Sequence, residues 1–234
     1  VMNTRNPIFA DWRVRQALIE AFNFRFVNMT LSGGTDPRIT SYFSNSDLAM
    51  QPGPATGREA ELLAPYTAEL PPGTLQGYSL PPGGPRAVDR ASIRDALDLL
   101  AQAGWTVRDG VLKNAAGAPF RFEILLNQAG SAMRSNAEMR QIVDIFVESL
   151  RNLGIKPQVT LLDPAQYVER TNNYQFDMTW YERGLSLSPG NEQLLYWGHD
   201  GVTKPGTKNW MGMNSPAAEA MIAEMGRAGS IQDY

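Results

Sequence analysis

The most constraining feature of this 234-residue sequence is an apolar repeat between residues 137 and 153. Its apolar side chains recur every three or four positions, so a 3.6-residue period places them on one face of a helix. Charged residues fall largely on the other side, and Gly154 follows as a glycine that tolerates positive φ at a helix end. The repeat predicts a long amphipathic helix with a buried face of Met139, Ile142, Val143, Phe146, Leu150 and Leu153.

Two short β-prone segments, at residues 157–162 and 176–181, follow this helix. Between them, Asp163 can cap a second helix and Pro164 suits its first turn. Strand, helix and strand in this order predict a right-handed parallel unit, and a third strand is expected at residues 120–127. The predicted fold class is therefore α/β. Because ligands in open α/β sheets bind just past the carboxyl ends of strands, residues 182–192 are where a site is expected.

The rest of the chain predicts further helices and one hairpin. Asp11 is a candidate N-cap for a helix that ends near Ala21, residues 89–103 form a second amphipathic repeat, and Ser215-Pro216 begins a last helix. Asp109-Gly110 lies between two short β-prone runs, which predicts a type I′ turn. Residues 52–86 form a proline- and glycine-rich excursion, and within it residues 71–85 are expected to form neither a helix nor a central strand.

Composition excludes several classes of function. The net charge of −3 gives no electrostatic case for binding nucleic acid, so no nucleic-acid partner is expected. The absence of cysteine excludes disulfides, thiol catalysis and cysteine-ligated metal sites. No apolar run has the length of a membrane span. The sequence contains no phosphate-binding loop, dinucleotide fingerprint, nucleophile elbow or zinc-protease motif, and we expect no cofactor and no metal.

Few residues are suited to catalysis. The chain has one histidine, His199, beside Asp200 in a glycine-flanked loop. Glu182 and Glu192 flank the loop after the last predicted strand, and a carboxylate pair can do acid–base work. A hydrolase that uses these loop carboxylates or His199 is therefore kept as the alternative function.

The same loop is better suited to holding a ligand. Trp180 and Tyr181 supply flat apolar surface, and Arg183 supplies a fork of donors that fits a carboxylate or phosphate. In the competing structural interpretation, Trp180 fills the sheet edge and Arg183 pairs with Glu182 or Glu192. The predicted ligand-binding residues are Trp180, Tyr181, Glu182, Arg183, Ser188 and Asn191.

The two ends of the sequence predict that it is a fragment of a longer polypeptide. Residues 1–7 read as extended chain already in progress, and residues 230–233 resemble a helix start with no helix behind it.

Several stretches, in the same order, resemble the large solute-binding proteins of family 5, the oligopeptide, dipeptide and nickel receptors of ABC importers. Residues 188–192 (SPGNE) and 196–198 (YWG) place the resemblance closest to the YejA-like branch. The other matching stretches are residues 9–18 (FADWRVRQAL), 93–105 (IRDALDLLAQAGW), 120–126, 150–159 (LRNLGIKPQV) and 176–180 (FDMTW).

The resemblance implies a lobe similar to type II periplasmic binding proteins, with a mixed sheet and flanking helices. Residues 1–234 would then be a single C-terminal lobe of a two-lobe protein. Its function would be to bind a peptide or peptide-like solute and deliver it to the permease of an ABC importer. The implied location is the periplasm, and the implied state is a monomer without catalytic activity.

One position departs from the family. In its peptide binders, an aspartate three residues past the strand tryptophan holds the amino terminus of the ligand. Here that position is Arg183, so the resemblance implies an anionic ligand group or an internal salt bridge there.

Overall fold

The computed structural model describes residues 1–230, so the helix start expected at residues 230–233 lies outside the described residues except for Ser230. The chain divides into two compact units. Unit 1 consists of Val1–Arg38 and Pro81–Glu182, and unit 2 consists of Ile39–Leu80 and Arg183–Tyr234. The single lobe expected over residues 1–234 stays a prediction. Among residues 1–230, no helix is both long and apolar enough to cross a membrane.

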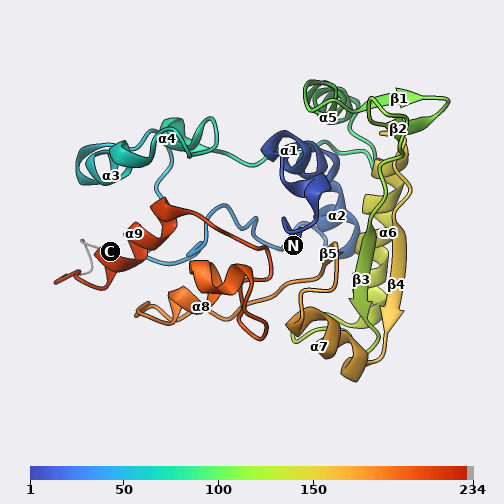
Figure 1. The fold of residues 1–234 in the computed structure, drawn as a ribbon. Coiled ribbons are helices and arrows are strands. Elements are labelled where there is room, and N and C mark those ends of the chain that lie inside the picture. Colours follow the sequence, from blue (N-terminus) through green and yellow to red (C-terminus); the bar gives the residue numbers. More distant parts are fainter. Residues whose placement is uncertain (231–234) are drawn as a thin grey trace. The chain divides into compact units, whose positions relative to one another are not determined.

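Unit 1 is built on a three-stranded parallel sheet with the order β4-β3-β5 (Figure 1). All three strands were expected, but each is shorter than its β-prone segment. β5 is the shortest because only Met178 and Thr179 pair with β3, opposite Ile124 and Leu125. The strands are β3 (Glu123–Asn127), β4 (Gln158–Leu162) and β5 (Met178–Thr179).

The start of the chain lies along the free side of β5. Met2 forms an antiparallel bridge with Met178, and the backbone N–H of Asn3 donates to the carbonyl of Asp177 at 2.8 Å. This bridge makes the pairing mixed, as the resemblance implied, although the three named strands are parallel. The predicted α/β class is confirmed.

Helices and one hairpin surround this sheet in unit 1. α6 runs alongside β3 and β4, and α1 packs against α5 (Figure 1). The predicted helices are present, with N-caps at Asp11, Asp89 and Asp163. The elements are η1 (Pro7–Phe9), α1 (Trp12–Ala21), α2 (Phe24–Leu31), α5 (Arg90–Gln102), β1 (Thr106–Arg108), β2 (Val111–Lys113), α6 (Asn136–Arg151) and α7 (Pro164–Asn172).

The long helix α6 begins with a capping box. The Ser135 hydroxyl accepts from the N–H of Glu138 at 3.3 Å, and the Glu138 carboxylate accepts from the N–H of Ser135 at 2.9 Å. Two N–H groups that the helix itself leaves unpaired are thereby satisfied. The apolar face predicted for this helix is buried, from Met139 (1% exposed) to Leu153 (0%), within the core of unit 1.

The hairpin docks on the end of α6 through a glycine. Asp109 (φ 55°) and Gly110 (φ 72°) both have the positive φ that a type I′ turn requires, as predicted. Leu112 in β2 donates its N–H to the carbonyl of Gly154 at 3.0 Å. Gly154 has a φ of 73°, and a Cβ at this position would lie 2.7 Å from the nitrogen of Leu112. Glycine is therefore required at 154 for both its conformation and its close backbone contact.

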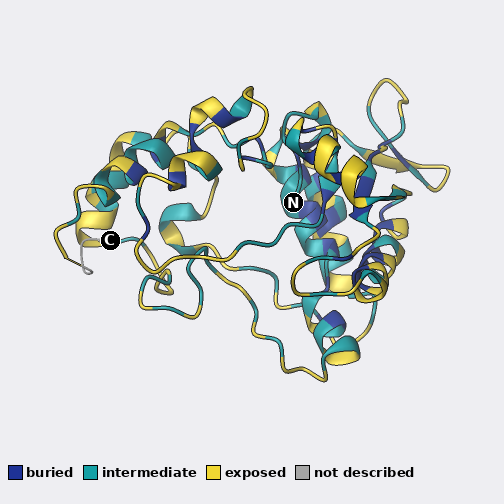
Figure 2. Cartoon of the chain, turned by 90° about the horizontal axis from the view of Figure 1, so that it is seen from below, coloured by how far each residue is buried: buried dark blue, intermediate teal, exposed yellow. Residues whose placement is uncertain are grey.

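Unit 2 is made of short helices with few buried residues (Figure 2). The expectation of no helix within residues 71–85 was wrong, because Thr74–Gly77 forms one turn. Prolines border this turn without entering it, and Gly73 (φ 87°) and Gly77 (φ 88°) supply left-handed conformations at its ends. The helices are α3 (Gly57–Leu63), η2 (Ala64–Tyr66), α4 (Thr74–Gly77), α8 (Gln193–Trp197), η3 (His199–Val202) and α9 (Pro216–Met225).

We expect Gly154→Ala to destabilise the full-length protein more than Gly104→Ala does. Both glycines are left-handed, so each substitution costs about 1–2 kcal/mol of backbone strain. Nothing lies within 4 Å of a Cβ at Gly104, whereas at Gly154 the close contact with Leu112 adds about 1–3 kcal/mol. Thermal unfolding of the two variants measures the difference. Equal losses of stability would show that the hairpin can shift without cost.

Candidate functional site

In unit 1, the segment that leaves β5 meets the loop between β3 and α6. These strands are parallel, so their carboxyl ends lie at the same edge of the sheet. Glu182 joins the two segments, because its Oε1 accepts from Ser131 Oγ at 2.6 Å and its Oε2 accepts from the N–H of Met133 at 3.2 Å. Glu182 Oε1 also accepts from Trp180 Nε1 at 2.7 Å. Glu182 thus fixes both the loop and the indole of Trp180.

Hydrogen bonds of two buried hydroxyls, those of Tyr167 and Thr179, hold the end of β5. Tyr167 on α7 places its hydroxyl 2.9 Å from Thr179 Oγ1, and that oxygen donates to the carbonyl of Leu125 at 2.8 Å. The Tyr167 hydroxyl also donates to the carbonyl of Trp180 at 3.2 Å. Burial raises the pKa of Tyr167 above its usual value. Because these hydrogen bonds span α7, β5 and β3, they fix where Trp180 leaves the sheet.

The β3–α6 loop has a second tie within unit 1. Arg134 Nη2 lies 2.6 Å from Asp36 Oδ2, and the same carboxylate oxygen accepts from Ser32 Oγ at 2.6 Å. The hydrogen bond from Ser32 lowers the pKa of Asp36 most, and the hydrogen bond from Arg134 is the second largest cause. Gly130 (φ 84°) lies in the same loop, where a Cβ would come 2.7 Å from the carbonyl oxygen of Arg134. The loop is therefore held in one conformation.

In unit 2, Arg183 stacks on aromatic rings. Its guanidinium carbon lies 3.1 Å from the centroid of the Tyr196 ring and 4.9 Å from that of Tyr42. Its Nη2 donates to Gln193 Oε1 at 3.4 Å. Burial lowers the pKa of Arg183, while Tyr196 and Glu192 act in the opposite direction. Such stacking stabilises a cation by about 0.5–2 kcal/mol.

The salt bridge that the structural interpretation assigned to Arg183 is absent from the ion pairs of the described residues. The Glu192 carboxylate accepts from the N–H of Gly190 at 2.9 Å and from Gln193 Nε2 at 3.0 Å. Arg183 Nε and Nη1 and the Tyr42 hydroxyl are buried without an acceptor or donor among the described residues. The stack of Arg183 on its aromatic rings thus contains three buried polar atoms without a hydrogen bond. A ligand with acceptor oxygens would satisfy them.

The other predicted site residues differ in burial. Tyr181 is half-buried in unit 1, and Ser188 and Asn191 are exposed in unit 2. The hydrogen bond and ring contacts of Arg183 described above involve neither Ser188 nor Asn191. Sequence reasoning missed Tyr42, Gln193 and Tyr196. The i, i+3 spacing of Gln193 and Tyr196 places both on one side of α8, which is a sequence signal, whereas nothing in the sequence joins Tyr42 to Arg183.

The residues considered for catalysis are engaged in structural contacts. His199 is exposed, its Nδ1 lies 2.8 Å from Asn214 Oδ1, and its N–H donates to Glu219 Oε1 at 2.5 Å. Within residues 1–230, no group of three or more His, Cys, Asp or Glu side chains is placed to hold a metal ion.

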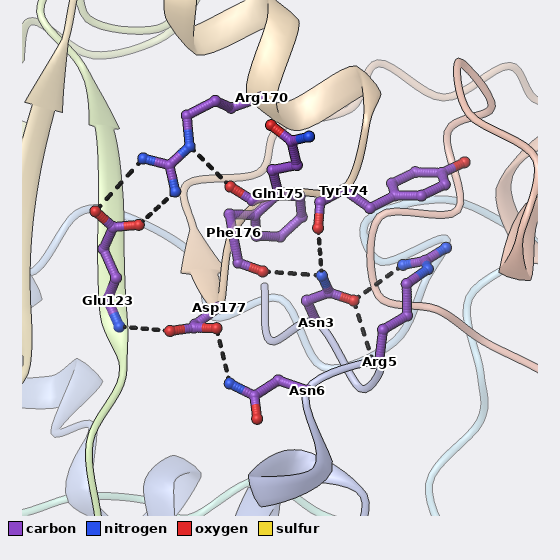
Figure 3. Close-up of a pocket in the computed structure, with 9 residues that line it drawn as sticks. All are labelled: Asn3, Arg5, Asn6, Glu123, Arg170, Tyr174, Gln175, Phe176 and Asp177. Atoms are coloured by element: carbon purple, nitrogen blue, oxygen red, sulfur yellow. Dashed lines mark hydrogen bonds and ion pairs between the residues drawn. The ribbon is translucent and has the colours of Figure 1, made fainter.

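A pocket of about 470 Å³ lies at the amino ends of β3 and β5 in unit 1 (Figure 3). Its polar groups bind one another: Arg170 Nη2 meets Glu123 Oε2 at 2.6 Å, and Asn6 Nδ2 donates to Asp177 Oδ1 at 2.7 Å. Asn3 donates to the carbonyls of Tyr174 and Phe176 (Figure 3). These contacts fasten residues 1–6 to the sheet, so we interpret this pocket as structural. Its lining residues are Asn3, Arg5, Asn6, Glu123, Arg170, Tyr174, Gln175, Phe176 and Asp177.

Solved structures with the same fold include solute receptors. The oligopeptide-binding protein AppA of Bacillus subtilis, in complex with a nonapeptide, matches with a TM-score of 0.68 and 21% identity over 100% of this chain and 40% of its own. NikZ of Campylobacter jejuni, in complex with Ni(L-His), matches with a TM-score of 0.70 and 14% identity over 99% and 39%. The expected type II periplasmic-binding-protein fold is confirmed.

Relatives in sequence carry binding-protein names, among them YejA, as the resemblance implied. A putative binding protein of Brucella melitensis is 37% identical over 100% of this chain and 37% of its own length. The probable peptide-binding protein YejA of Agrobacterium fabrum is 34% identical over 96% and 36%. The peptidoglycan-binding protein YepA of the same organism is 32% identical over 100% and 37%. This chain therefore spans little more than a third of their length.

A family model also matches most of the chain. The model described as "Bacterial extracellular solute-binding proteins, family 5 Middle" covers residues 1–205. Together with the YejA relatives and the type II fold, the match shows that the chain belongs to the bacterial extracellular solute-binding proteins, family 5.

Proposed function

We propose that this chain is the ligand-binding part of a periplasmic receptor that delivers peptides or peptide-like compounds to the permease of an ABC importer. Membership of family 5 supports the receptor role, and relatives named peptide-binding and peptidoglycan-binding support the solute class. We further propose that residues 1–234 belong to one lobe of a two-lobe, monomeric protein that closes on its ligand. The hydrolase hypothesis has no support from the family or its relatives.

The observation that carries the proposal is that two buried donors of Arg183 have no acceptor among the described residues. A guanidinium whose Nε and Nη1 are desolvated without an acceptor is unfavourable unless a ligand supplies one. The stack on Tyr196 keeps the guanidinium plane fixed, and a fixed fork of donors matches the two oxygens of a carboxylate. Arg183 therefore holds a carboxylate of the solute. This is the anionic ligand group that the resemblance implied at Arg183, with the charge opposite to the amino terminus that the family's peptide binders hold there.

The remaining site residues take different roles. In unit 1, Trp180 offers a flat apolar surface, half-buried at the end of β5, and Glu182 positions it instead of binding the solute. Tyr181 is a weaker candidate for contact. In unit 2, the exposed side chains of Ser188 and Asn191 offer hydrogen bonds to peptide groups of the solute.

We predict that Arg183→Ala lowers the binding of peptides about 10- to 150-fold. A hydrogen bond to a charged group contributes roughly 1.5–3 kcal/mol, which corresponds to that range. The probe is an equimolar mixture of synthetic tripeptides, and the measurement is the mass-spectrometric recovery of peptides bound to the full-length protein. Arg183→Lys retains the charge without the fork and should lie between Arg183→Ala and the unchanged protein.

Arg58→Ala is the matched control, because Arg58 is also an arginine of unit 2 and forms an exposed ion pair with Glu224 at 3.5 Å. Its recovery of peptides should equal that of the unchanged protein. If Arg183→Ala recovers as much peptide as Arg58→Ala, the proposed role of Arg183 is wrong.

We also predict that Glu182→Ala destabilises the protein by about 1–3 kcal/mol, since it leaves Trp180 Nε1 without its acceptor and removes the nearer of the two acceptors of Ser131 Oγ. Glu182→Gln keeps one amide oxygen and should cost less. Glu148→Ala, which removes an exposed partner of Arg151 on α6, should stay within about 0.5 kcal/mol of the unchanged protein. Chemical denaturation measures all three. A loss for Glu182→Ala no larger than that for Glu148→Ala would contradict the positioning role.

A further inference from the structure

Unit 2 contains a depression that none of the predicted site residues lines. It has a volume of about 420 Å³ and is formed by residues 43–47 together with Leu185 and Leu187. The two leucines are 37% and 65% exposed, which leaves apolar surface in water beside an empty space. The volume falls within the range of about 300–1,000 Å³ that is typical of small-molecule pockets. An aromatic or branched aliphatic side chain fits such a space.

The depression adjoins the rings on which Arg183 stacks. Phe43, which lines it, packs edge-on against Tyr42 at 4.9 Å between ring centroids, and Tyr42 is one of the rings beside the guanidinium of Arg183. On the other side, Leu185 follows Arg183 by two residues. All of these residues belong to unit 2. A group bound by Arg183 therefore lies beside a space that has Phe43, Leu185 and Leu187 on its apolar side.

The loop that forms the polar side of the depression is held by its own hydrogen bonds. Ser44 Oγ accepts from the N–H of Ser41 at 2.8 Å and donates to the carbonyl of Ser41 at 2.9 Å. Ser46 Oγ donates to the carbonyl of Phe43 at 2.8 Å, and the N–H of Met50 donates to Ser41 Oγ at 3.1 Å. These hydrogen bonds hold the loop in one conformation, so the loop loses little conformational entropy when a side chain of the ligand enters. The serine hydroxyls are already used, and Asn45 and Asp47 lie on the same polar side. The apolar side chains that can contact an occupant are Phe43 and the two leucines.

We propose that the depression is a subsite for the C-terminal side chain of the bound peptide, with the C-terminal carboxylate held by Arg183. This inference rests on the proposed function and adds its substrate class: short peptides that end in an apolar residue. A carboxylate and the side chain of the same residue share one Cα, so a subsite that adjoins Arg183 through Tyr42 and Phe43 suits the side chain of the residue whose carboxylate Arg183 holds. Transfer of a leucine-sized side chain from water into such a site strengthens binding about tenfold or more.

The test uses the full-length protein and two equimolar mixtures of synthetic tripeptides, one with free C-terminal carboxylates and one with C-terminal amides. Bound peptides are eluted and sequenced by mass spectrometry. We expect free-acid peptides that end in Leu, Ile, Val or Phe to be enriched about tenfold or more over those that end in Ser or Asn. Amides should be recovered far less than free acids.

Leu187→Asp should abolish the preference for apolar C-terminal residues by lowering the recovery of peptides that end in Leu, Ile, Val or Phe about tenfold, to the level of those that end in Ser or Asn. Val168→Asp is the matched control, because Val168 is an exposed apolar residue (52%) on α7 in unit 1, and it should leave the preference intact. Because Leu187 is 65% exposed, its replacement should not unfold the protein. Thermal unfolding of both variants checks this.

Three results would overturn the inference. Peptides bound without enrichment of apolar C-terminal residues, or an enrichment that persists in Leu187→Asp, would remove the subsite and leave the receptor proposal standing. Equal recovery of amides and free acids would remove the assignment of the C-terminal carboxylate to Arg183. Recovery of no peptide from the unchanged protein would instead contradict the proposed function itself, and with it this inference.

Discussion

Parallel pairing on both sides of β3 is the constraint on which unit 1 depends. Parallel strands need long crossovers, so the chain passes through α6 before β4 and through α7 before β5. The pairing also places the ends of β3 and β5 at one edge, where the residues that follow each strand must meet. Glu182 bonds across this meeting point to Ser131 and Met133. The position of Trp180 is thus a consequence of strand direction.

The two units use their charged residues in opposite ways. In unit 1, the carboxylate of Glu182 has its acceptor positions filled, so it serves the structure. In unit 2, Arg183 lies on Tyr196 with two of its donors buried and without an acceptor among the described residues. A filled carboxylate gains little from a ligand, whereas desolvated donors gain a full hydrogen bond each. This contrast is why the proposed recognition rests on Arg183, even though both residues are in the same sequence segment.

Much of the fold could be predicted from the sequence because its signals are local. The face of α6 follows from apolar spacing, the caps from Asp11 and Asp163, and the hairpin turn from Asp109-Gly110. The short extent of β5 could not be predicted, since it depends on which residues of β3 lie opposite. The single turn at Thr74–Gly77 was missed because prolines were taken to exclude helix throughout a segment whose middle contains none.

The candidate site was only partly predictable. Trp180, Glu182 and Arg183 were predicted from the rule that loops after parallel strands carry function, and their roles in binding stay proposals. The partners that give each residue its role come from distant sequence: Ser131 for Glu182, and Tyr42 for Arg183. No periodicity or spacing connects residues 51 or 141 positions apart, because such contacts are set by tertiary packing. The sequence therefore indicated the segment but not which of its residues are engaged and which are available.

The most direct test of this account is hydrogen–deuterium exchange of the full-length protein with and without a bound tripeptide mixture. The account predicts protection on binding in residues 183–196, around Arg183. It predicts no change in residues 1–6 and 170–177, which line the pocket at the amino ends of the strands. Protection confined to that pocket, with residues 183–196 unaffected, would contradict the central claim that the segment after β5 holds the solute.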